Sequence, residues 1–209
     1  MAKLYFNYGA MGCGKTRELL RVRYNYIENG KDVLVMKSVL DTRGDTKVTS
    51  RDNNSVETDF LIHQDDNVYE IISRYIEKNT LNCILIDEAQ FLSEEHVIQL
   101  TDIVDLLNIP VICYGLKADF QNKLFPGSAA LFVYADESSS IKTICSSFNC
   151  EDGATMNIRF EDGSPVFEGE QIAIDGEMTD AGKNITYKPM CRRCRRTLVR
   201  KINRERFIK

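Results

Sequence analysis

The sequence lacks tryptophan, has only two histidines and contains no long hydrophobic run. A membrane-spanning helix needs roughly 18 consecutive apolar residues, and no stretch of this chain approaches that length. The apolar N-terminal segment meets the polar residue Asn7 too early for a secretory signal peptide. His63 and His96 are predicted to be surface groups rather than metal ligands or bases. These absences make a soluble cytoplasmic protein the default expectation.

Length and charge narrow the classes of protein further. The 209 residues are 43% apolar and 28% charged, which suits one sizeable globular domain with a small appendage. Residues 191–209 hold nine Lys/Arg and one acidic residue, a net charge of +8, which leaves −12 for residues 1–190. The acidic body repels nucleic acid, so nucleic-acid binding by the basic end is a minor hypothesis. A solvated basic helix or extension is favoured there.

Short apolar runs alternate with helical patterns along the first two thirds of the chain. Such alternation, with strands apolar throughout, indicates an α/β fold whose parallel sheet is covered on both faces. Residues 41–59 are polar and are predicted to form a loop. A helix beginning at Lys15 carries Leu20, Tyr24 and Ile27 at helical spacing, and Ser93 is a plausible N-cap of a later helix. Strands are predicted at 4–8, 33–36, 83–86, 111–114 and 131–134, and a further helix around 68–76.

The character of the chain changes near residue 141. Helical periodicity disappears, glycines recur, and paired cysteines bracket the segment. We therefore predict a main domain over 1–140, a second small domain over 141–200 and a basic C-terminal tail over 201–209.

A glycine-rich phosphate-binding motif follows the first predicted strand and opens the first predicted helix. It fits G-x-x-x-x-G-K-[ST], in which backbone N–H groups and a helix N-terminus bind phosphate oxygens. The lysine reaches the β- and γ-phosphates, and the hydroxyl of the last residue ligates Mg²⁺. A chance match in an ordinary glycine turn is the alternative, but the strand–turn–helix context favours nucleotide binding. The motif consists of Gly9, Ala10, Met11, Gly12, Cys13, Gly14, Lys15 and Thr16.

Two acidic residues end the third apolar strand. Asp87 stands where a Walker-B carboxylate holds Mg²⁺, directly or through water. Glu88 follows it, and a carboxylate beside the γ-phosphate can accept a proton from a hydroxyl nucleophile or orient a water. An acidic pair at a helix N-terminus is the alternative. These motifs do not identify the acceptor of the phosphoryl group, because phosphate-binding loops serve motors, switches and kinases alike.

Three further segments are informative together with the phosphate-binding motif and residues 41–43. They are residues 87–91 (DEAQF), residues 114–120 (YGLKADF) with Phe125, and residues 191–194 (CRRC) preceded by Tyr187. Their order and approximate spacing resemble the type II, zinc-containing thymidine kinase family over nearly the whole chain. The resemblance implies a RecA-like parallel sheet with flanking helices plus a small zinc-bound lasso domain.

The resemblance also implies an activity and its residues. It implies transfer of phosphate from ATP to the 5′-hydroxyl of thymidine or deoxyuridine in nucleotide salvage, with Glu88 as proton acceptor and Asp87 and Gln90 beside the ATP. It further implies a homotetramer, feedback inhibition by thymidine triphosphate, and neither a nucleic-acid nor a membrane partner. The nucleoside-site residues that it implies are Met11, Asp41, Arg43, Phe91, Leu116, Phe120, Phe125, Ile174, Gly176 and Tyr187. Taken alone, the three phenylalanines are more often core residues than ligand contacts, by about two to one.

Seven cysteines without a secretory signal make a disulfide framework unexpected. Two close pairs, Cys145 with Cys150 and Cys191 with Cys194, resemble the structural zinc site of the family, and their gaps fall in the range that zinc sites use. Free thiols or a transient disulfide are the alternative. The family usually has two residues between its first two cysteines and this chain has four, so Cys150 is the safer ligand.

Two other functions compete with thymidine phosphorylation. One is a small RecA-like ATPase that uses its basic, zinc-bearing end on DNA. The other is a related kinase with an altered base preference, which would differ only in the nucleoside pocket.

Overall fold

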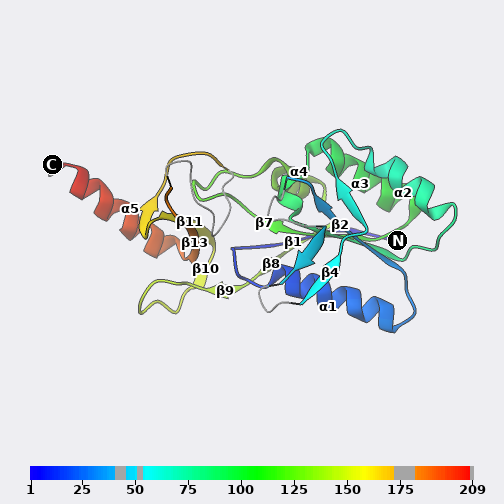
Figure 1. The fold of residues 1–209 in the computed structure, drawn as a ribbon, viewed down its shortest axis with the longest axis horizontal. Coiled ribbons are helices and arrows are strands. Elements are labelled where there is room, and N and C mark those ends of the chain that lie inside the picture. Colours follow the sequence, from blue (N-terminus) through cyan, green and yellow to red (C-terminus); the bar gives the residue numbers. More distant parts are fainter. Residues whose placement is uncertain (41–45, 51–53, 172–181, 208–209) are drawn as a thin grey trace. The chain divides into compact units, whose positions relative to one another are not determined.

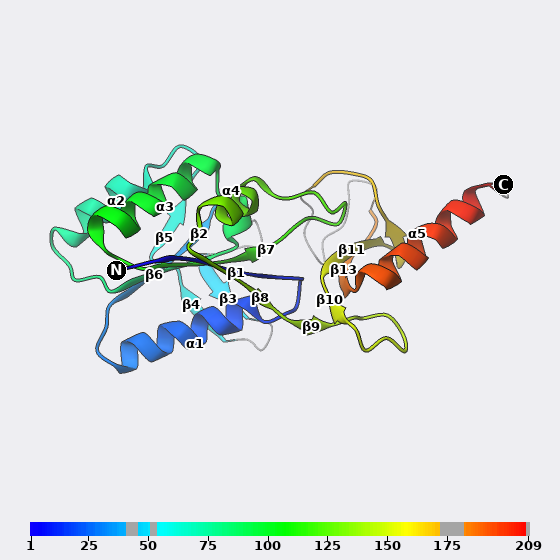
Figure 2. The same ribbon diagram turned by 180° about the vertical axis from the view of Figure 1, so that it is seen from behind.

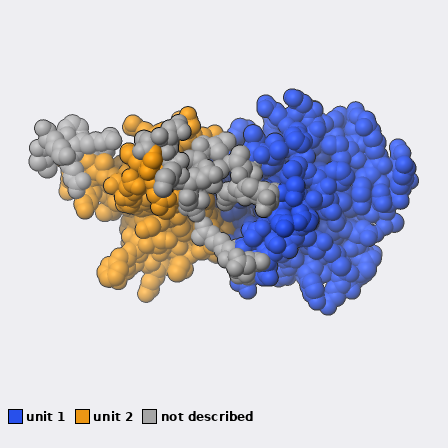
Figure 3. All heavy atoms as spheres, in the orientation of Figure 1, with its two compact units in different colours: residues 1–8, 14–117, 124–141 blue, residues 9–13, 118–123, 142–209 orange. Residues whose placement is uncertain are grey.

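The computed structural model describes residues 1–40, 46–50, 54–171 and 182–207. The chain forms two compact units (Figure 3). Unit 1 contains residues 1–8, 14–117 and 124–141, and unit 2 contains residues 9–13, 118–123 and 142–209. Unit 2 therefore includes two short segments from the N-terminal two thirds of the chain.

A six-stranded sheet forms the centre of unit 1. Strand β2 pairs in parallel with β5 and β6, and β6 pairs in parallel with β7. Every residue of β6 is buried, as expected for a parallel strand that is covered on both faces. The carboxyl ends of these strands lie at one edge of the sheet, where α/β proteins bind their ligands. In spatial order the strands are β5 (Phe60–Ile62), β2 (Val33–Ser38), β6 (Cys83–Asp87), β7 (Val111–Leu116), β1 (Leu4–Gly9) and β8 (Glu137–Ile141).

Helices cover both faces of this sheet (Figures 1 and 2). On one face lie α1 (Lys15–Glu28) and the hairpin of β3 (Lys47–Thr49) and β4 (Ser55–Glu57), whose Val48 packs with Leu19 and Tyr114. The other face carries α2 (Val68–Ile76), α3 (Glu94–Leu107) and α4 (Pro126–Tyr134) over a larger apolar core. The predicted α/β fold with a parallel sheet and flanking helices is confirmed.

One predicted strand is wrong. Residues 131–134 belong to α4, which begins with Pro126 at a position where proline is well tolerated in a helix. Leu131 is fully buried within an element that is apolar on most sides, so no polar face marks its helical period. The strand beside β1 is instead β8, whose residues are polar and mostly exposed.

Three smaller predictions are also corrected. The segment 41–59 contains the β3–β4 hairpin among its described residues, although it was expected to be a loop. In α1 the buried apolar residue is Leu19. Of the predicted stripe, Leu20 packs against the same core, whereas Tyr24 and Ile27 are 61% and 46% exposed. Ser93 caps α3 as predicted. His96, expected at the surface, is buried, and its Nδ1 accepts a hydrogen bond from the Ser93 N–H in a capping box.

Unit 2 is smaller and is built from antiparallel strand pairs. Strand β11 (Met156–Glu161) pairs with both β12 (Ser164–Val166) and β13 (Ile185–Met190), and β9 (Thr143–Ile144) pairs with β10 (Gly153–Ala154). Helix α5 (Arg192–Phe207) follows, and it includes residues 201–207 of the basic segment. The core of this unit is small and includes cysteines among its few buried apolar residues. Within the described part of the chain, no helix is both long and apolar enough to cross a membrane.

Candidate active site

The glycine-rich motif adopts backbone conformations that favour glycine. Gly12 and Gly14 have φ angles of 72° and 89°, in the left-handed region that other residues rarely adopt. Gly14 is the N-cap of α1, and no side chain in the described structure caps that helix. The positive end of the α1 dipole lies at this turn and favours an anion. Lys15, the first residue of α1, is buried.

Thr16 and Asp87 meet at the carboxyl edge of the sheet. The Thr16 hydroxyl donates a hydrogen bond to Asp87 Oδ2 over 3.1 Å, although 71 residues separate the two in sequence. A hydroxyl and a carboxylate are oxygen donors of the type that Mg²⁺ prefers. The pair that the sequence predicted as magnesium ligands is thus brought together, and its chemistry fits that ion.

Burial changes the protonation of Asp87. Removal from water, followed by the nearby negative charge of Glu88, raises the pKa of the Asp87 carboxyl to about 7. Hydrogen bonds from the Glu88 N–H and the Thr16 hydroxyl, and the positive charge of Lys15, oppose this shift. A cation bound at Asp87 would relieve the unfavourable burial of its charge.

Glu88 begins a short 3₁₀ helix, η1 (Ala89–Phe91), that turns the chain away from β6. Its backbone lies in the left-handed region at φ 49°, which is uncommon for a residue with a side chain. Its carboxylate oxygen Oε2 accepts a hydrogen bond from Gln90 Nε2 over 2.6 Å. Gln90 itself is fully buried, and its Oε1 accepts from the N–H of Leu116.

Three of the predicted pocket residues lie in unit 1. The rings of Phe91 and Phe125 meet edge to face, with their centroids 5.6 Å apart. Phe125 and Leu116 are buried, and Phe91 is partly buried. Phe91 follows Glu88 within η1, and Leu116 is tied to η1 through Gln90. The acidic residues and this apolar group therefore belong to one small region.

Three others belong to unit 2. The N–H of Met11 donates to the buried Asn157 Oδ1 over 2.8 Å. Phe120 is buried beneath the guanidinium group of Arg159, whose Cζ lies 5.2 Å from the ring centroid. Tyr187 is partly buried on β13, in register with Arg159 of β11.

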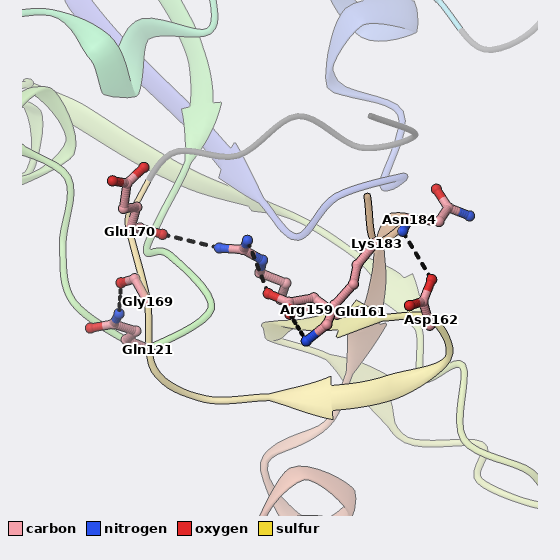
Figure 4. A network of polar contacts seen from close by, with 8 residues as sticks. All are labelled: Gln121, Arg159, Glu161, Asp162, Gly169, Glu170, Lys183 and Asn184. Atoms are coloured by element: carbon pink, nitrogen blue, oxygen red, sulfur yellow. Dashed lines mark hydrogen bonds and ion pairs between the residues drawn. The ribbon is translucent and has the colours of Figure 1, made fainter. Parts of the chain in front are cut away.

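Arg159 is the functional candidate that the sequence did not reveal. Its side chain is 7% exposed, forms an ion pair with Glu161 over 3.2 Å and donates to the carbonyl of Glu170. Figure 4 shows the surrounding polar contacts, which bind the segments on both sides of residues 172–181 to β11 and its turn. The sequence of β11 carries no clear signal for this role, because the strand also contains Asn157 and Glu161 and four successive residues are buried. The residues drawn are Gln121, Arg159, Glu161, Asp162, Gly169, Glu170, Lys183 and Asn184.

The four paired cysteines converge in unit 2. The Sγ atoms of Cys145, Cys150, Cys191 and Cys194 all lie within 4.8 Å of one another. Tetrahedral zinc with bonds of about 2.3 Å places its sulfurs about 3.8 Å apart, and the Sγ atoms of Cys150 and Cys191 are 3.7 Å apart. Backbone N–H groups point at two of the sulfurs, from Cys191 to Cys145 Sγ and from Cys194 to Cys191 Sγ. The cluster fits a zinc ion, and the longer gap before Cys150 does not displace Cys145 from it.

Four predicted nucleoside contacts lie outside the described residues. These are Asp41 and Arg43 in the segment 41–45, and Ile174 and Gly176 in the segment 172–181.

Comparison with known proteins decides the family. The sequence model of the thymidine kinase family matches residues 2–195. A thymidine kinase of Lactiplantibacillus plantarum is 47% identical over 193 residues, which cover 92% of this chain and 94% of that protein. A thymidine kinase of Listeria monocytogenes is 46% identical over 195 residues, covering 93% and 96% of the two chains. The chain belongs to the thymidine kinase family.

Membership of the thymidine kinase family confirms the resemblance that the sequence motifs indicated. The fold agrees, with a mostly parallel sheet, flanking helices and a four-cysteine cluster that could hold zinc. The matched region of the family ends at residue 195, so most of α5 lies beyond it. The individual roles of site residues in this thymidine kinase stay predictions.

Proposed function

We propose that this protein is a thymidine kinase that transfers the γ-phosphoryl group of ATP to the 5′-hydroxyl of thymidine or deoxyuridine. The single observation that supports this most is the arrangement at the end of β6. There the Thr16 hydroxyl contacts Asp87, and the next residue, Glu88, turns out of the strand beside an aromatic pair. A phosphate-binding loop, a metal-binding pair and a candidate proton acceptor thus occur in a chain of this family.

The nucleotide would bind at Gly9–Thr16, where backbone N–H groups and Lys15 contact its phosphates. Thr16 and Asp87 would hold Mg²⁺, which when bound neutralises charge on the phosphate oxygens. Gln90 was also expected to bind ATP. Its buried amide, with protein partners at both ends, supports a different role.

The acceptor alcohol would be activated by Glu88. The 5′-oxygen forms a bond to the γ-phosphorus while the bond from that phosphorus to the β–γ bridging oxygen breaks, which releases ADP. The proton of the 5′-hydroxyl passes to the Glu88 carboxylate. Much of the rate would come from holding the alcohol and the phosphate in line, since this chemistry depends mainly on position and charge.

Apolar residues implied by the family resemblance would contact the planar base and the sugar of the nucleoside. Its remaining contacts rest on the family resemblance, because they lie outside the described residues. In unit 1 the proposed residues are Phe91, Leu116 and Phe125, in unit 2 they are Met11, Phe120 and Tyr187, and those outside are Asp41, Arg43, Ile174 and Gly176.

Zinc would have a structural role in unit 2. Four thiolates, Cys145, Cys150, Cys191 and Cys194, would hold it and leave no open position for substrate. The apolar core beside them is small, so the ion would supply much of the folding free energy of this unit.

The experiment that tests this function is a panel of nucleosides incubated with ATP and Mg²⁺. We expect thymidine and deoxyuridine to yield monophosphates and stoichiometric ADP, and purine nucleosides to yield neither. DNA-stimulated hydrolysis of ATP without nucleoside phosphorylation would instead favour the DNA-dependent ATPase that the basic end suggests. Phosphorylation of another nucleoside alone would indicate an altered base preference.

Regulation and assembly are proposed from the resemblance alone. We expect thymidine triphosphate to inhibit competitively with respect to thymidine, and the protein to be a homotetramer in the cytoplasm. Inhibition kinetics test the feedback inhibition, and light scattering of the purified protein tests the oligomeric state. Cell fractionation tests the location.

A further inference from the structure

The side chain of Gln90 links the candidate proton acceptor to the central sheet. Its Nε2 donates to Glu88 Oε2 over 2.6 Å, and its Oε1 accepts from the N–H of Leu116 over 2.9 Å. Gln90 has no exposed surface, so water does not compete for either contact. The amide therefore connects η1, which follows β6, to the end of β7.

The direction of this amide is fixed by its partners. The backbone N–H of Leu116 can only donate a hydrogen bond, so the side-chain oxygen of Gln90 must face it. The amide nitrogen then faces Glu88 and donates to its Oε2. Glutamine meets both requirements at once, whereas glutamate offers no donor to Glu88 and methionine offers neither group.

Close packing also fixes the position of the amide. A Cβ atom added to Gly115 would lie 2.9 Å from Gln90 Oε1 and 3.1 Å from the Gln90 backbone nitrogen. Such distances are shorter than van der Waals contact allows, so β7 needs glycine where the amide passes. The side chain cannot move to another rotamer without breaking one of its two buried hydrogen bonds.

We propose that Gln90 is a positioning residue, which holds the Glu88 carboxylate toward the acceptor alcohol. The inference rests on the proposed role of Glu88 as proton acceptor. Glu88 lies in the left-handed region at a sharp exit from the sheet, so neighbouring helical turns do not hold its side chain. The hydrogen bond from Gln90 Nε2 limits where the Glu88 carboxylate can point.

A double-mutant cycle tests this directly, because a residue that acts through another loses its effect when the other is changed. The variants are Glu88→Gln, Gln90→Met and the double variant, each measured for kcat and for KM of ATP and thymidine. We expect Glu88→Gln to lower kcat by roughly 10²- to 10⁴-fold. Gln90→Met should lower kcat by roughly 10- to 100-fold with little change in KM for ATP. In the Glu88→Gln background it should change kcat by about twofold or less.

Each other outcome has a definite meaning. Near-normal turnover of Glu88→Gln would overturn the proposed proton acceptor, whatever Gln90 does. If Glu88→Gln is inactive as expected but Gln90→Met lowers kcat equally in both backgrounds, the positioning role is wrong. A raised KM for ATP in both backgrounds would instead show that Gln90 acts on the nucleotide.

A second substitution guards against loss of folding in Gln90→Met. Gln90→Glu keeps the shape of the side chain and an acceptor for Leu116, but places a carboxylate against Glu88. We expect it to lower kcat at least as much as Gln90→Met in the wild-type background. In the Glu88→Gln background the amide–carboxylate pair forms again with its members exchanged, so the further loss should be small. A large loss there would overturn the proposal.

Discussion

Asp87→Asn should change how the stability of the free protein depends on pH. The raised pKa of Asp87, about 7 against a usual 3.8, means that the folded protein binds one more proton than the unfolded chain between these values. Stability from this group is therefore fully present below pH 3.8 and is lost as the pH rises through 7. The asparagine variant has no such titration, and its side-chain oxygen can still accept from Thr16.

The magnitude follows from the shift. A difference of one bound proton changes the free energy of unfolding by about 1.4 kcal/mol per pH unit. Between pH 5 and pH 7 the wild type should therefore lose up to about 3 kcal/mol relative to Asp87→Asn. Part of this effect comes from the repulsion between Asp87 and Glu88, which contributes to the raised pKa and which Asp87→Asn removes.

Urea denaturation at pH 5, 6, 7 and 8, without nucleotide or Mg²⁺, measures this difference. Asp65→Asn, in an exposed turn, is the matched control and should follow the wild type at every pH. Parallel curves for the wild type and Asp87→Asn would refute the claim that burial opposes the charge of Asp87. Adding Mg²⁺ and ADP at pH 8 should stabilise the wild type more than Asp87→Asn, since a bound cation favours the ionised carboxylate.

Three further substitutions test the packing and the unit 2 contacts. Gly127→Ala should lower the free energy of unfolding by about 1–3 kcal/mol, because its Cβ would lie 2.4 Å from a backbone oxygen of η1. Gly153→Ala is the control, since its Cβ would lie 3.9 Å from the nearest atom, and thermal melts compare the two variants. Arg159→Met removes the buried cation that pairs with Glu161 and should lower the free energy of unfolding in urea by about 3 kcal/mol. Lys183→Met removes the exposed cation of the same carboxylate and should lower it by under about 1 kcal/mol. Cys194→Ser should lower the zinc content measured by mass spectrometry together with the melting temperature, and retention of a full equivalent of zinc would contradict the assigned site.

Local chemistry explains why the first half of the site was predictable. The phosphate-binding motif has fixed spacing because its backbone must turn from strand to helix within a few residues, so the turn appears directly in the sequence. Asp87 was identified because it ends an apolar strand that is buried on both faces. The cysteine pairs were identified because zinc requires several thiolates at short spacing, and thiolates are rare.

Long-range contacts explain what the sequence did not predict. Arg159 contacts Phe120, which is 39 residues away in the sequence. Polar and apolar residues are mixed along β11, so its sequence does not show that this arginine is buried. Strand β8 was missed because an exposed edge strand can be polar on both faces. Helix α4 was mistaken for a strand because its exposed residues Val133 and Tyr134 are apolar too, so no polar face reveals the helical period.

The glycines around η1 show how packing alone positions the proposed proton acceptor. Gly115 and Gly127 both have ordinary backbone angles, so neither is required by a turn. Instead, Gly115 leaves space for the Gln90 side chain. Gly127 lets α4 pack closely against η1, because a Cβ added there would lie 2.4 Å from a backbone oxygen of η1. The two glycines enclose the segment that follows Glu88 from two directions, so the position of that carboxylate depends on β7 and α4 as well as on its own strand. Residues that do not contact a substrate can therefore determine the position of the carboxylate that is proposed to accept the proton of the alcohol.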